Sequence, residues 1–105
     1  MKILELIKNL NTMREFVDKG YELPFSLRRA IRLNDEVMVK EYIIFDEERN
    51  RIKQSGLSED EINDKLVELA NTEVDVKIEK VSYDIMETVT IPIQDENMIM
   101  FMLEM

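Results

Sequence analysis

Residue types that usually catalyse reactions or bind metals are nearly absent from this sequence. The chain has 105 residues, with no Cys and no His. Zinc, haem and copper sites therefore lack their usual ligands, and cysteine nucleophiles and Ser-His-Asp catalysis are excluded. The chain has only two glycines and no glycine-rich phosphate-binding loop. We therefore expect a protein that is not an enzyme, with no catalytic residues and no cofactor.

Carboxylates are the chemical groups that remain, and they gather in the second half of the chain. Residues 57–105 carry a net charge of −10, whereas residues 1–56 carry +1, which gives −9 for the chain. A one-sided field selects partners of the opposite charge. The candidate partner-binding residues are Glu59, Asp60, Asp64, Glu68, Asp75 and Glu79. The alternative is that the acidity only keeps the protein in solution.

The same acids could in principle bind Ca²⁺ or Mg²⁺ through oxygen. However, no D-x-D-x-D-G loop is present, and Gly56 precedes the acidic cluster instead of lying inside it. Ser58 and Glu61 fit a helix capping box, which accounts for part of the cluster without a metal. We therefore expect no metal site.

A basic patch in the first half of the chain consists of Arg28, Arg29 and Arg32. Such a patch could hold a phosphate or a small anionic ligand through charge-assisted hydrogen bonds. It could also pair internally with Glu5, Glu15 or the acidic second half. Direct binding of nucleic acid is not expected, because the chain is acidic and has no basic stripe with interleaved aromatic residues.

Helical periodicity runs through the first two thirds of the chain. Apolar residues at three- and four-residue steps predict helices over 2–19, 24–54 and 58–71. Gly20 is placed to end the first helix, Pro24 to begin the second and Ser58 to cap the third. Asn34 lies on the apolar stripe of the second helix, and we interpret it as a structural residue that makes buried hydrogen bonds.

The pattern changes after Thr72. Alternation of apolar and polar residues in 73–78, continued in 81–93, predicts a small antiparallel sheet drawn from 73–94. Asp95 is placed to cap a short helix over 96–103, with a strand as the competing interpretation. The methionine-rich tail, Met98 to Met105, overlaps this helix and must be covered, either by the first two helices or by a second subunit in a homodimer.

These elements predict one domain, residues 1–105, of the α+β class and mainly helical. An antiparallel helical pair packs with a third helix, and the small antiparallel sheet lies near the C-terminus. No stretch of about 18 apolar residues is present, so no membrane span is expected. The absence of a signal-peptide pattern and of Cys leads us to expect a cytoplasmic location.

The order of features resembles a family of small, uncharacterised proteins of phages and prophages of Gram-positive bacteria. The resemblance rests on Leu23-Pro24, Ala30-Ile31-Arg32-Leu33-Asn34, Leu66-Val67-Glu68-Leu69, Glu73-Val74-Asp75-Val76-Lys77-Ile78 and Met98-Ile99. It implies a phage accessory protein in the cytoplasm of a bacterial host, and it carries over no functional residues.

Three functions follow as hypotheses. The first is a non-enzymatic acidic protein that binds a protein partner with a basic surface and inhibits a host nucleic-acid-binding or defence protein. The second is an oligomeric structural or assembly component of a phage particle. The third is a small anionic-ligand binder that uses the patch of Arg28, Arg29 and Arg32.

Overall fold

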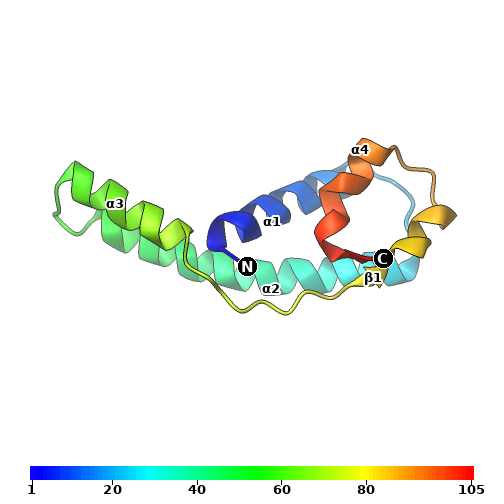
Figure 1. Ribbon diagram of the computed structural model, residues 1–105, viewed down its shortest axis with the longest axis horizontal. Coiled ribbons are helices and arrows are strands. Elements are labelled where there is room, and N and C mark those ends of the chain that lie inside the picture. The colour runs from blue at the N-terminus through cyan, green and yellow to red at the C-terminus, as the bar shows by residue number, and fades with distance from the viewer.

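The computed structural model describes residues 1–105 and is mostly helical (Figure 1). Three long helices come first and short elements follow. In chain order the elements are α1 (Ile3–Asp18), α2 (Phe25–Lys53), α3 (Glu59–Ala70), β1 (Val81–Ser82), the 3₁₀ helix η1 (Tyr83–Thr88), α4 (Ile93–Glu96), the 3₁₀ helix η2 (Asn97–Met102) and β2 (Leu103–Glu104). The three long helices confirm the predicted ones to within a residue or two.

The helices begin and end next to the residues that predicted their ends in the sequence. Gly20 follows α1 with a φ of 75°, a left-handed conformation that favours glycine after a helix end. Pro24 precedes α2, where its missing N–H leaves no hydrogen bond unmade. Helix α2 then continues through Asn34 and Asp35 as one helix of 29 residues.

Helix α2 extends beyond the core that it forms with α1. Figure 1 shows α2 returning alongside α1 in the opposite direction and continuing past the start of α1, where α3 folds back onto it. We call residues 46–71 the arm. Only Ile52 of the arm is buried, and α3 has no buried residue at all. The molecule is therefore elongated, with extents of 53 × 23 × 21 Å.

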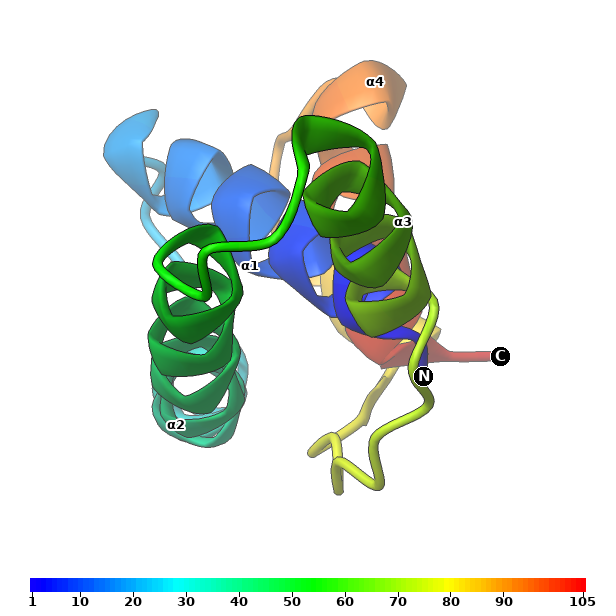
Figure 2. The same cartoon turned by 90° about the vertical axis from the view of Figure 1, so that its left-hand side faces the viewer.

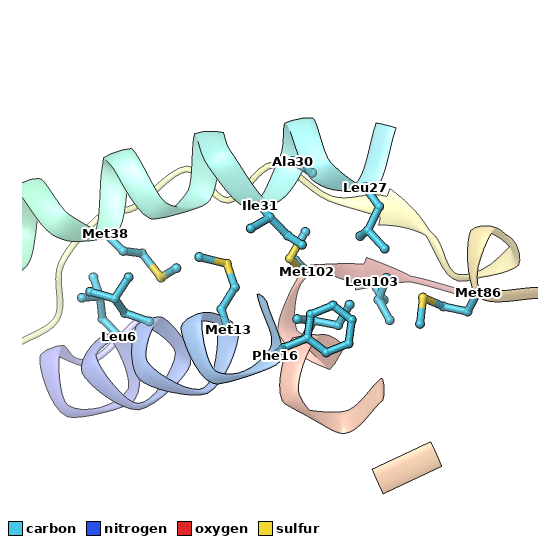
Figure 3. Packing of buried hydrophobic residues seen from close by; sticks show 12 residues of the cluster. Leu6, Met13, Phe16, Leu27, Ala30, Ile31, Met38, Met86, Met102 and Leu103 are labelled. Atoms are coloured by element: carbon cyan, nitrogen blue, oxygen red, sulfur yellow. The ribbon is translucent and has the colours of Figure 1, made fainter. Parts of the chain in front are cut away.

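The core lies between α1 and α2 and is closed by the C-terminal segment. Leu6, Met13 and Phe16 of α1 face Leu27 and Met38 of α2. Figure 3 shows Met102 and Leu103 between these helices at one end. The methionine-rich tail is thus largely core, although its last residue, Met105, is exposed.

The predicted antiparallel sheet is wrong. The structure contains one two-stranded sheet, in which β1 pairs with β2 in parallel, with Val81 opposite Leu103 and Ser82 opposite Glu104. Residues 73–80 form no strand apart from a single antiparallel bridge between Lys2 and Glu73, and residues 83–88 form the helix η1. The alternation shows which side chains are half-buried, but it does not require a neighbouring strand within the chain.

The predicted cap at Asp95 is also wrong. Helical turns begin three residues earlier than predicted, after Pro92, and continue through α4 and η2 to Met102. The short strand β2 then follows. Asp95 lies inside α4 and is buried. Its carboxylate therefore does not cap the start of a helix.

Asn34 is structural, as its position on the apolar stripe predicted. Its side chain is fully buried, and its amide bonds to both backbone groups of Glu79. Nδ2 donates to the Glu79 carbonyl at 2.9 Å, and Oδ1 accepts from the Glu79 N–H at 2.7 Å. The Asn34 amide thereby makes the two backbone hydrogen bonds that a neighbouring strand would make with residue 79.

Candidate protein-binding surface

The acidic start of α3 is built on the predicted capping box. Ser58 precedes the helix, and its Oγ accepts a hydrogen bond from the backbone N–H of Glu61 at 3.3 Å. The same hydroxyl donates to the Glu61 carboxylate at 3.1 Å. The cap occupies Glu61, so the remaining acids of α3 are available for other contacts.

Three of those acids share one face of α3. With about 100° of rotation per residue, Asp60, Asp64 and Glu68 lie within about 80° of one another. The half-buried residues Ile62, Leu66 and Leu69 lie on the opposite face, toward α2. We call Asp60, Asp64, Val67 and Glu68 the outer face of α3. Its acids are exposed, and Val67 among them is 62% exposed.

No ion pair in the structure neutralises this face. The pairs that form involve the N-terminus and arginines or lysines of α1, α2 and the loop between them, and none reaches Asp60, Asp64 or Glu68. The arm also carries α3 past the start of α1 along the long axis of the molecule, as Figure 1 shows, and in Figure 2 α3 lies nearest the viewer. Outer-face carboxylates are therefore accessible to another molecule.

The other three predicted partner-binding residues do not join this face. Glu59 begins α3 about 100° around the helix from Asp60. Asp75 is exposed on the segment that runs beside α2, and Glu79 at the end of that segment pairs with Arg29 at 3.5 Å. The structure thus brings together three of the six acids.

The predicted basic patch is divided between separate contacts. Arg29 pairs with Glu79, which is the internal pairing with the acidic second half. Arg32 is 82% exposed and lies 3.5 Å from Glu36 on the same helix, and the Arg28 Nε donates to the Leu23 carbonyl at 3.1 Å. The three guanidinium groups therefore do not converge on one anion.

A groove of about 770 Å³ lies between α1 and α2 on the side of Arg28 and Arg32. Its lining balances three arginines against three acids: Arg14, Arg28, Arg32, Asp18, Asp35 and Glu36. Arg14 is already held by Asp35 through bonds of 2.8 and 3.1 Å, and this hydrogen bonding raises the pKa of Arg14. The groove is consequently not a concentrated positive site.

Two partly buried acid–tyrosine contacts were not anticipated from the sequence. The Tyr21 hydroxyl donates to Asp95, which also lies 3.4 Å from the Lys19 ammonium, and the Tyr83 hydroxyl donates to Glu96 at 2.7 Å. Hydrogen bonding to these carboxylates raises the pKa of both tyrosines. The polar run Gln94–Asn97, set between the apolar residues Ile93 and Met98, is the signal that could have predicted polar partners here.

Comparison with known proteins finds no matching family model, no matching curated protein and no matching solved structure. No group of three or more acidic side chains is arranged to hold a metal ion. None of the helices combines the length and the apolar character needed to cross a membrane.

Proposed function

We propose that this protein is a non-enzymatic binding protein whose outer α3 face attaches to a basic surface of another protein. The observation that carries the proposal is a set of three exposed carboxylates, without internal cations, on an arm that contributes almost nothing to the core. The apolar contacts of α3 with α2 come from its other side, and only Glu68 of the three acids borders the groove between the two helices, near Arg51 and Lys65. Binding to another molecule explains both why the arm extends from the core and why its acids have no internal cations.

The physical consequence of such a surface is attraction to clustered Lys and Arg. Complementary charge raises the association rate and orients the partner. Val67 lies beside the carboxylates and adds an exposed apolar contact at the edge of the face. The resulting interface is small, polar and dependent on ionic strength.

The resemblance to phage proteins is our reason for proposing a partner in a bacterial host. We propose a host nucleic-acid-binding or defence protein, whose basic surface would be occupied by the acidic arm. The anionic-ligand alternative has lost its three-arginine cluster, because Arg29 is paired with Glu79.

The test is capture from a lysate of a Gram-positive bacterium with the immobilised protein. Asp60→Lys, Asp64→Lys and Glu68→Lys together change the net charge from −9 to −3. The matched control, Glu5→Lys with Glu15→Lys and Glu22→Lys, makes the same change at exposed positions outside the arm. We expect the wild type and the control to retain the same basic proteins, and the arm variant to lose them.

Salt provides the second readout. The retained proteins should dissociate as NaCl rises from about 50 mM to about 500 mM, because screening shortens the reach of exposed charges. Retention by the arm variant equal to that of the wild type would contradict the proposal. So would capture that does not change with salt.

A further inference from the structure

The segment between α3 and β1 has the sequence of a strand but no partner strand. Its apolar residues Val74, Val76 and Ile78 are half-buried and pack against the core, whereas Asp75 and Lys77 between them are exposed. The backbone N–H and C=O groups of Asp75–Ile78 make no hydrogen bond with the rest of the chain. Four consecutive residues therefore have the side-chain pattern of a strand without its ladder.

Both ends of this segment are held in strand-like pairing. At one end the Val74 N–H donates to the Met1 carbonyl at 2.9 Å, and the Met1 ammonium donates to the Val74 carbonyl at 3.0 Å. At the other end Asn34 bonds to both backbone groups of Glu79, and Val81 enters β1. The middle is thus fixed in place before any partner arrives, which lowers the entropic cost of pairing.

The segment lies at the periphery of the molecule. In Figure 1 it runs beside α2 along the long axis, and in Figure 2 no other part of the chain lies beyond it. An accessible run of unpaired backbone groups is a template for a strand from another molecule.

We propose that Asp75–Lys77 pairs in antiparallel fashion with the same residues of a second copy of this chain, centred on Val76. In this register Asp75 faces Lys77 of the second copy, and Lys77 faces Asp75. Two opposite-charge pairs form across the ribbon, and neither residue has an ion-pair partner within its own chain. The sequence of this edge is therefore complementary to itself.

The remaining charges are compatible with this contact. Glu73 lies 3.2 Å from the Met1 ammonium and Glu79 lies 3.5 Å from Arg29, so both flanking acids have partners already. Because the segment follows the long axis, antiparallel pairing directs the two arms to opposite ends of the dimer. The acidic outer faces are then far apart relative to the screening length of about 8 Å at physiological salt. They also remain free, so the inference does not depend on the proposed function.

Charge reversal at the two facing positions tests the register. Asp75→Lys alone and Lys77→Asp alone each place like charges opposite one another in a homodimer. An equimolar mixture of the two variants restores both opposite-charge pairs in a heterodimer. Glu87→Lys and Lys80→Asp are the matched controls, since they make the same charge changes at exposed positions outside 75–78. Far-UV circular dichroism checks that each variant is folded.

Light scattering after size exclusion and hydrogen exchange measure the outcome. We expect the wild type and both controls to double in molar mass between about 10 μM and about 1 mM, the range of a small interface. The amides of residues 75–78 should become protected over the same range. Each single variant should stay monomeric, and their mixture should dimerise.

Three results would overturn the inference. One is a wild type that stays monomeric up to about 1 mM with fast-exchanging amides at 75–78. Another is a dimer that Asp75→Lys leaves intact, or a mixture of the two variants that fails to associate. The third is protection of these amides in a lysate but never in the concentrated pure protein, which would assign the edge to a strand of a different protein.

Discussion

At the scale of single residues, the fully buried Asn34 carries the most structural information. Its amide satisfies two backbone groups of Glu79, a residue 45 positions away, and Nδ2 also lies 3.7 Å from the Met102 sulfur. The contact joins α2 to the segment 73–80, which has few other hydrogen bonds. The position of Asn34 on the apolar stripe predicted burial, but no sequence signal identifies so distant a partner.

Replacing Asn34 should therefore destabilise the fold more than replacing other asparagines. Asn34→Ala leaves the N–H and C=O of Glu79 without partners in a buried site, and we expect a loss of about 1–3 kcal/mol in the free energy of unfolding. Urea denaturation measures this change. Asn63→Ala, at an exposed position of α3, is the control and should change stability by less than about 0.5 kcal/mol. Equal effects of the two substitutions would contradict the assigned role.

Tyr21 and Tyr83 predict how stability depends on alkaline pH. Bonding to Asp95 and Glu96 raises the pKa of both phenols in the folded state. A group with a raised folded pKa contributes its full stability below its unfolded pKa, which is about 10 for tyrosine. That stability is lost as the pH rises from about 10 through the folded value.

The tyrosine contribution can be isolated by substitution. The denaturation midpoint of the wild type should fall as the pH rises above about 10. The double variant Tyr21→Phe with Tyr83→Phe should start less stable at pH 8 and show a shallower alkaline decline. Tyr42→Phe is the control, because Tyr42 packs against Phe45 and donates to no carboxylate in the structure. An alkaline decline that is as steep in the double variant as in the wild type would contradict this assignment.

At the scale of elements, the three long helices were predictable and the sheet was not. Helix boundaries depend on local signals, such as Gly20, Pro24 and the Ser58 cap, that act within a few residues. Strand pairing depends on which distant segments meet. The alternation of 73–78 identified the half-buried side chains correctly, yet helical surfaces and the N-terminus provide the contacts that a neighbouring strand was expected to make.

The candidate site shows the same limit. The helical period is enough to group Asp60, Asp64 and Glu68 on one face, because positions four apart share a helix face, but the prediction selected them by charge alone. It could not show that Glu79 pairs with Arg29, since that ion pair depends on where the segment 73–80 crosses α2. The six predicted acids were therefore identified by charge, but their grouping needed the fold.

The arm should be the least stable of the helical elements. Its helix α3 has no buried residue, and Ile52 is the only buried residue of its α2 part. Local opening costs little where few apolar contacts are lost. Hydrogen exchange should therefore be faster in α3 than in α1 and in the part of α2 beside α1.

A substitution in the arm should change this region alone. Ile52→Ala removes its main apolar contact and should accelerate exchange in α3 while leaving the α1 amides unaffected. Leu27→Ala, in the core, should accelerate exchange in all helices and cost about 2–5 kcal/mol of global stability. Uniform acceleration by Ile52→Ala would show that the arm unfolds only together with the core.

At the scale of the whole molecule, shape and charge are linked. A domain of about 100 residues that packs around one core has a radius of gyration of about 13 Å. The value here is 16.5 Å, because the arm extends beyond the core. Keeping the uncompensated acids of α3 on an extension separates them from the acids in the rest of the chain, which reduces the repulsion between the two groups.

Small-angle X-ray scattering should show this elongated shape in dilute solution. We expect a radius of gyration near 16.5 Å, slightly increased by the hydration layer, at concentrations low enough to keep the chain monomeric. A value near 13 Å would mean that the arm folds back onto the core and that its outer face is covered. Scattering from the Asp75→Lys variant supplies the control, since that substitution is expected to prevent self-pairing without moving the arm. Agreement between the dilute wild type and the variant at higher concentration would show that the extension belongs to the single chain and not to a dimer.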